Sequence, residues 1–167
     1  MNLYILVIQY YLTYFKMASQ TITSNSRTLE QMSLDHGIKT IEIDGATLHG
    51  GDRYLVKING QKVYLTGKSF AYFTKLAWFR KHGEGWVDND ALEPGFNQAR
   101  YLYRMKTEIR EGLRKGEEKE TRPLEWGVAE NRRDGRYRMI ANPGVITFNE
   151  ANLKRYPDHT VSSLVTR

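Results

Sequence analysis

Four short runs between residues 38 and 66 alternate apolar with polar side chains, the pattern of strands that have one buried face. They are "IKTIEID" (38–44), "ATLHG" (46–50), "YLVKI" (54–58) and "KVYLT" (62–66). The last two flank Asn59-Gly60, a strong signal for a two-residue hairpin turn, which sets Val56 opposite Val63 on the apolar face. The runs therefore predict a four-stranded antiparallel sheet at the N-terminal end of the fold.

Apolar residues recur at helical spacing after this sheet. Thr66 is a suitable N-cap and Gly83 a suitable stop, so we expect a helix between them. Its i, i+3, i+4, i+7 spacing is typical of a stripe that faces the core, not of a ligand-binding box. The stripe comprises Phe70, Phe73, Leu76, Ala77 and Arg80. A very short strand is expected at 85–87 and one helical turn at 88–94, which Pro94 closes.

A second long helix is predicted over residues 97–113. At 100° per residue, the side chains that gather within about 60° of Leu102 are Gln98, Met105, Ile109 and Leu113. The opposite face carries Arg100, Tyr103, Arg104, Thr107 and Glu111. We therefore expect one aliphatic side packed into the core and one basic side in solvent. A charged loop follows at 114–123.

The stretch "ENRRDGRYRM" (130–139) places four arginines around an Asp-Gly pair. A two-residue turn at that pair would mix polar and apolar residues on the face meant for the core. A four-residue loop at 132–135 instead pairs Glu130 with Tyr137 and leaves one apolar face, made of Trp126, Val128, Tyr137 and Met139. Because burial sets register, we expect a hairpin over 126–140 with the longer loop. The arginines then lie at its tip (Arg132 and Arg133) and on its outer face (Arg136 and Arg138).

Composition narrows the class of function. The chain has 167 residues and no cysteine, which excludes disulfides and thiolate metal sites and favours a reducing, cytoplasmic location. Its four histidines are too scattered to form a metal-ligand pair on one helix. Net charge is +6, and residues 99–140 hold 12 basic and 8 acidic side chains. This local excess indicates a polyanionic partner such as nucleic acid, with a solvated mixed-charge surface as the alternative.

The chain ends differ in character from its middle. Residues 1–16 are almost uncharged, and as a helix the first 15 of them would span only about 22 Å, short of a ~30 Å hydrocarbon core, so a membrane anchor is the weaker interpretation. Together with the polar leader that follows, they form an expected extension over 1–37. The folded domain is expected at 38–141, and residues 142–167 form a C-terminal extension.

A helix with a basic outer face, followed by a hairpin with arginines at its tip, is the arrangement of a winged helix. Three stretches strengthen this interpretation: "INGQKVYLTGKSFAYFTKLA", "YLYRMKTEIREGL" and "DGRYRM". Over roughly residues 38–141 they make the sequence similar to the OmpR/PhoB-type winged helix-turn-helix domain of bacterial response regulators. The resemblance implies an α+β fold with an N-terminal four-stranded antiparallel sheet, three helices and a C-terminal β-hairpin wing.

The same resemblance implies double-stranded DNA binding and a role in regulating transcription, with no cofactor, metal or catalytic residue. The major-groove residues would be Arg100, Tyr103, Arg104 and Thr107, and the wing residues Arg132, Arg133 and Arg136. Binding as a homodimer or in tandem stays open. The sequence departs from the family where Pro94 shortens the middle helix, where Arg136 replaces the usual glycine, and in residues 1–37, which are too few for a receiver domain.

Two other classes of function remain. A winged helix can serve as a protein–protein interaction module, for which an aromatic surface would be available from Trp78, Phe79, Tyr101 and Tyr103. An enzyme is not expected, because "HGEG" (82–85) and "DHG" (35–37) lack a nucleophile, a phosphate loop or metal-ligand spacing.

Overall fold

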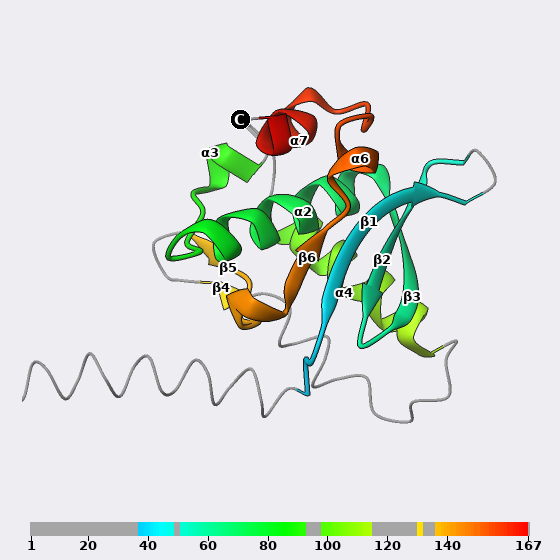
Figure 1. Ribbon diagram of the computed structural model, residues 1–167. Coiled ribbons are helices and arrows are strands. Elements are labelled where there is room, and N and C mark those ends of the chain that lie inside the picture. The colour runs from blue at the N-terminus through cyan, green and yellow to red at the C-terminus, as the bar shows by residue number, and fades with distance from the viewer. Residues whose placement is uncertain (1–36, 49–50, 93–97, 115–129, 132–135, 167) are drawn as a thin grey trace, which may run out of the picture.

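The computed structural model describes residues 37–48, 51–92, 98–114, 130–131 and 136–166. Within these ranges the fold is α+β, with a mixed four-stranded sheet in the order β3-β2-β1-β6 and a second sheet of two strands, β4-β5. The strands of the larger sheet are β1 (Ile41–Thr47), β2 (Arg53–Ile58), β3 (Gln61–Thr66) and β6 (Ile146–Phe148). Figure 1 shows the long helices α2 (Gly67–His82) and α4 (Gln98–Arg114) on one side of this sheet.

The hairpin of β2 and β3 has the register that the sequence predicted. Val56 pairs with Val63, and the turn residues Asn59 and Gly60 have φ of 52° and 80°. A type I′ turn requires positive φ at both central positions, which Asn-Gly tolerates best. The Asn59 amide also fixes the chain just before β1, since its Oδ1 accepts the backbone N–H of Lys39 at 2.7 Å.

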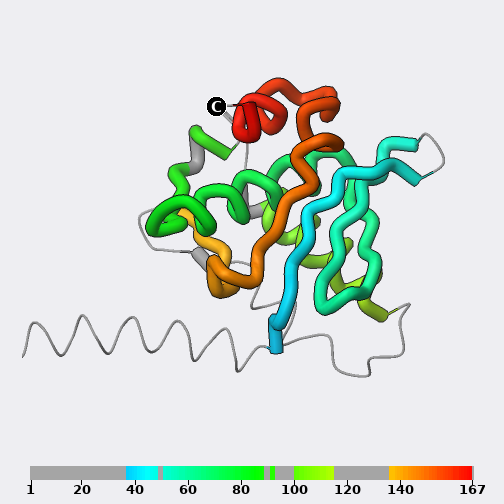
Figure 2. The backbone as a smooth tube through the Cα atoms, viewed as in Figure 1, coloured from blue at the N-terminus to red at the C-terminus, as the bar shows by residue number. Residues whose placement is uncertain are grey.

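The predicted four-stranded antiparallel sheet is wrong in two respects. The runs 38–44 and 46–50 do not form two strands, because β1 continues through an irregularity in which residues 44–46 stand opposite Leu55 alone. Gly45 has φ of 77° there, so the chain bulges and does not reverse. The fourth strand is β6, which pairs with β1 in parallel, and Figure 2 shows the two side by side.

Helix α2 starts and stops as predicted, with Thr66 at the N-cap and Gly83 at the C-cap. The apolar stripe is confirmed, since Phe70, Phe73, Leu76 and Ala77 are all fully buried. Burial extends around the helix between Ser69 and Ala77, because α2 lies between the sheet, α4 and the C-terminal segment. Arg80 leaves the stripe and donates from Nε to the Ala141 carbonyl oxygen at 2.9 Å.

The predicted phase of α4 is confirmed. Met105, Ile109 and Leu113 are fully buried, and Leu102 is 9% exposed. Helix α4 approaches β3 closely at Gly112, where a Cβ would lie 2.7 Å from the Val63 Cγ1 atom. The single helical turn expected before it is α3 (Asn89–Leu92), whose last carbonyl accepts from the buried Nζ of Lys75 at 2.7 Å.

The second sheet has a register that neither predicted turn produces. β4 (Glu130–Asn131) and β5 (Tyr137–Arg138) pair Glu130 with Arg138 and Asn131 with Tyr137. The expected pairing of Glu130 with Tyr137 is therefore wrong by one residue. The other edge of β5 is fixed by a bridge between Val87 and Tyr137, with N···O distances of 2.9 and 3.0 Å. Of the short strand expected at 85–87, the structure forms this one bridge at Val87. The bridge fixes the position of β5 whatever the pattern of apolar residues in β4, and the predicted register was based on that pattern.

The C-terminal segment packs into the main core. It contains η1 (Pro143–Val145), β6, α6 (Glu150–Leu153), α7 (His159–Ser162) and η2 (Ser163–Thr166). Its buried side chains are Ile146, Leu153, Tyr156, Val161 and Val165. The Tyr156 hydroxyl donates to the Gly67 carbonyl oxygen at 2.7 Å, at the start of α2. Residues 142–166 are thus part of the same packing unit as the sheet.

Helix α7 is capped by Asp158, whose Oδ1 accepts from the Thr160 backbone N–H at 2.9 Å and from its hydroxyl at 2.7 Å. Burial acts to raise the pKa of Asp158, but these hydrogen bonds and the charges of Lys75 and Lys68 outweigh it and lower the pKa. None of the helices in the described ranges is long and apolar enough to cross a bilayer. Residues 1–16 lie outside those ranges.

Candidate nucleic-acid interface

The face of α4 opposite its buried stripe is directed to solvent. Arg100 and Arg104 are exposed, Tyr103 is 70% exposed, and Thr107 is half-buried. These four side chains recur at i, i+3, i+4 and i+7, so they line one side of the helix. Tyr103 is one of the most exposed large hydrophobic residues in the described ranges.

The exposed surface of α4 is more strongly basic than the sequence of the helix suggests. Residues 98–114 hold five basic and two acidic side chains. One of the two acids, Glu108, is only 10% exposed at its side chain, so Glu111 is the exposed acid. Arg114 extends the exposed basic face beyond the residues that the sequence singled out, and Arg110 lies half-buried at its flank. Their helical angles, about 120° and 80° from Leu102, were sufficient to place them there.

Glu108 connects the two long helices. Its Oε2 accepts the Thr66 backbone N–H at 2.9 Å, and its Oε1 accepts the Thr66 hydroxyl at 2.9 Å. Oε1 also lies 2.9 Å from Nε of Arg104. Thr66 makes no side-chain cap on α2, and the first turn of α2 has no acidic residue. The Glu108 carboxylate therefore places a negative charge at the positive end of α2 and fixes one edge of the Arg104 guanidinium.

Of the arginines predicted for a wing hairpin, the structure describes Arg136 and Arg138, while Arg132 and Arg133 lie outside the described residues. Arg136 is half-buried. The guanidinium carbon of Arg138 lies 4.2 Å from the centroid of the Trp86 ring, a cation–π contact that the sequence did not reveal. Trp86 directly precedes Val87, which bridges to Tyr137 of β5. The contact of Trp86 with Arg138 is therefore a second link between this segment and β5.

Strand β5 and helix α4 both pack on α2. Tyr72 of α2 packs edge-on against Tyr137 of β5, with ring centroids 6.3 Å apart. Met105 of α4 and Met139 beyond β5 belong to the same core cluster as Tyr72. Burial raises the pKa of both tyrosines. Helix α2 thus sets the spacing between α4 and β5.

The aromatic residues considered for a protein contact do not behave alike. Trp78 and Tyr101 are partly buried against the core, whereas Phe79 is 37% exposed. Trp78 packs against His82 with the rings tilted by 31° and their centroids 4.0 Å apart, and it meets Phe148 of β6 edge-on at 5.3 Å. The result is an aromatic cluster at the C-terminal end of α2, completed by a residue of β6 that local patterns did not connect with this helix.

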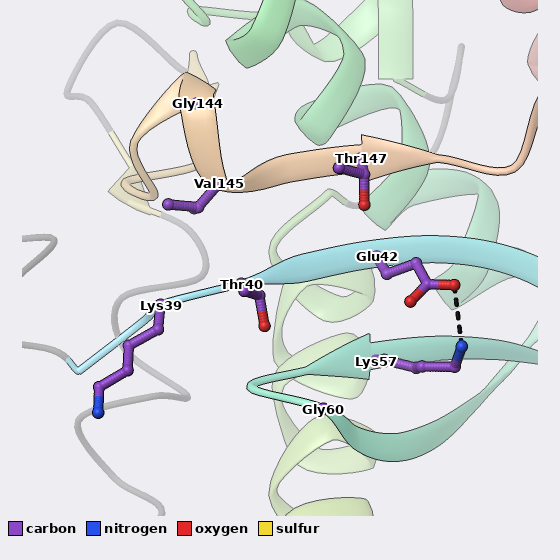
Figure 3. Close-up of a pocket in the computed structure, with 8 residues that line it drawn as sticks. All are labelled: Lys39, Thr40, Glu42, Lys57, Gly60, Gly144, Val145 and Thr147. Atoms are coloured by element: carbon purple, nitrogen blue, oxygen red, sulfur yellow. Dashed lines mark hydrogen bonds and ion pairs between the residues drawn. The ribbon is translucent and has the colours of Figure 1, made fainter.

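The open face of the larger sheet carries a hollow of about 340 Å³ (Figure 3). It is lined by Lys39, Thr40, Glu42, Lys57, Gly60, Gly144, Val145 and Thr147. Lys57 Nζ lies 2.9 Å from Glu42 Oε1 and 3.7 Å from Asp44 Oδ2. The hydrogen bond to Glu42 raises the pKa of Lys57. Lys57 and Glu42, which both line the hollow, therefore offset each other's charge.

Among the described residues, no three His, Asp or Glu side chains lie close enough to hold a metal ion. His82, from the "HGEG" stretch, has its Nδ1 3.0 Å from the Trp78 carbonyl oxygen. Comparisons with family models, curated proteins and solved structures give no match to this chain.

Proposed function

We propose that this chain is a winged helix-turn-helix protein that binds double-stranded DNA and regulates transcription. Helix α4 enters the major groove, and the hairpin at 126–140 contacts the backbone or minor groove beside it. A major groove is about 12 Å wide and admits an α-helix. The proposal assigns groove contacts to Arg100, Tyr103, Arg104 and Thr107, and wing contacts to Arg132, Arg133 and Arg136.

The observation that carries the proposal is the division of α4 into two faces. Three of its side chains are fully buried at the centre of the core, and the opposite face presents arginines and a 70% exposed tyrosine. A helix held so firmly from behind can enter a groove without losing its own packing. Arginine suits both guanine and phosphate, because its planar fork donates two parallel hydrogen bonds.

The order of elements supports the winged-helix assignment. A three-stranded antiparallel hairpin region leads into α2, and Val87 then bridges to β5. The one-turn α3 and the basic α4 follow, and β4 and β5 come next. In a winged helix the wing lies beside the recognition helix, and here both elements pack on α2.

Selection of bound duplexes from a random DNA library at near-physiological salt tests the proposal. We expect an enriched motif, and affinity for it that falls steeply as salt rises, because each phosphate that the protein neutralises adds about 0.9 to the slope of log K against log salt. Arg104→Ala should cost about 1–3 kcal/mol on the enriched site and much less on random DNA. The absence of any enriched motif, together with salt-insensitive binding, would refute DNA recognition.

A protein–protein interaction module is the second candidate. The observation that favours it is the cluster of Trp78, His82 and Phe148, with Phe79 exposed next to it. A mostly apolar protein contact would persist at salt concentrations that abolish DNA binding. Phe79→Ala should then weaken partner binding, whereas it should leave DNA binding by the first candidate unchanged.

A further inference from the structure

We propose that Glu108 is a positioning residue that orients Arg104 for base recognition. This inference rests on the proposed DNA binding. It assigns Glu108 no contact with DNA, since its side chain is only 10% exposed and its carboxylate is occupied by Thr66 and Arg104. Glu108 instead determines which edge of the Arg104 guanidinium faces the groove.

The geometry gives Arg104 one fixed edge. Nε donates to Glu108 at 2.9 Å, while the side chain as a whole is 56% exposed. A guanidinium has five donors in a rigid fork, so a bond through Nε leaves the edge formed by the two Nη groups for another acceptor. That edge is the one that can meet two adjacent acceptors such as guanine O6 and N7.

The anchor of Glu108 is itself outside α4. Thr66, whose backbone N–H and hydroxyl both donate to the carboxylate, is the N-cap of α2, a helix buried on nearly all sides. A surface arginine paired only with a glutamate of its own helix would keep much of its rotamer freedom. Here the backbone N–H and the hydroxyl of Thr66 hold the carboxylate between two packed helices, so less entropy remains for Arg104 to lose on binding DNA.

The same carboxylate reduces the attraction of Arg104 for phosphate. Glu108 therefore lowers the affinity of the protein for DNA of any sequence while it orients Arg104. Its removal should affect affinity and base preference in opposite directions. Loss of Glu108 should lower base preference while it leaves affinity for random DNA unchanged or higher. A merely structural role would instead lower affinity for every duplex in parallel with stability.

The test compares Glu108→Ala and Glu108→Gln with the parent on the duplex that the parent selects from a random library, and on that duplex with each base pair changed. We expect Glu108→Ala to lose base preference by about fivefold or more, the lower end of what one bidentate contact contributes, at the base pair identified by Arg104→Ala. Glu108→Gln should lose less, since its amide oxygen can still accept from Nε. In an Arg104→Ala background, Glu108→Ala should change preference no further.

Glu150→Gln is the control for charge, because it removes the same charge from an exposed side chain outside α4. It should change affinity for all duplexes by a similar small factor and leave preference unchanged. Retained preference in Glu108→Ala, or an equal loss with and without Arg104, would overturn the positioning role. If the parent selects no motif while its NMR spectrum shows an Arg104 Nε–H protected from exchange, the hydrogen bond to Glu108 exists. The proposed DNA recognition would then be wrong, and the positioning role with it.

Discussion

Gly112 offers the sharpest test of how α4 sits on the sheet, and therefore of which face it shows to solvent. Its position in the last turns of the helix would ordinarily favour alanine by about 1 kcal/mol. A Cβ there, however, would lie 2.7 Å from the Cγ1 atom of Val63 and 3.2 Å from both its Cβ and Cγ2 atoms. A rotamer change does not relieve this overlap, because the branched Cβ itself is too close and Val63 is fully buried.

Overpacking of this kind costs about 1–3 kcal/mol, which outweighs the helix-propensity gain of about 1 kcal/mol. We therefore expect Gly112→Ala to destabilise the protein by roughly 1 kcal/mol in urea unfolding followed by circular dichroism. Glu111→Ala, at the exposed neighbouring position, is the control for propensity and should change stability by less than about 0.5 kcal/mol.

The decisive measurement repeats Gly112→Ala in a Val63→Ala background. With the branched side chain removed, the overlap disappears and the propensity gain remains, so the same substitution should become stabilising by up to about 1 kcal/mol. A stabilising Gly112→Ala in the parent, or an equal effect in both backgrounds, would mean that α4 does not pack on β3 at this point.

Three further predictions concern the core, the wing and the C-terminal segment. Met105→Asp should abolish cooperative thermal unfolding, because an unpaired carboxylate at this fully buried site costs several kcal/mol, whereas Thr107→Ala should melt like the parent. Arg132→Ala combined with Arg133→Ala should weaken binding to all duplexes by similar factors in a salt titration; a change in base preference from this pair alone would contradict the wing role. The lowered pKa of Asp158 means that its contribution to stability is present above the unfolded pKa of about 3.8 and is lost as the pH falls through the folded value. Urea unfolding at a series of pH values should therefore show Asp158→Asn losing less stability than the parent toward acid pH, and parallel curves would refute this.

Much of the candidate site was accessible from the sequence. Periodicity alone identified the buried stripe of α4, and so the outward position of Arg100, Tyr103 and Arg104 followed without any tertiary information. The position of Glu108 did not follow in the same way. Its spacing from Arg104 suggests an ordinary surface pair, but its link to Thr66 joins residues 42 positions apart.

The sequence by itself determined the elements whose geometry is set by neighbouring residues: the β2–β3 hairpin and its register, the start and stop of α2, and the phase of α4. Turn chemistry and helical periodicity act over a few residues, so they can be read locally. Only the tertiary structure decided the parallel pairing of β1 with β6, the register of β4 and the anchoring of Arg104 through Glu108. In each case, a partner distant in the chain competes with the local pattern, and burial and hydrogen bonding at that contact determine the outcome.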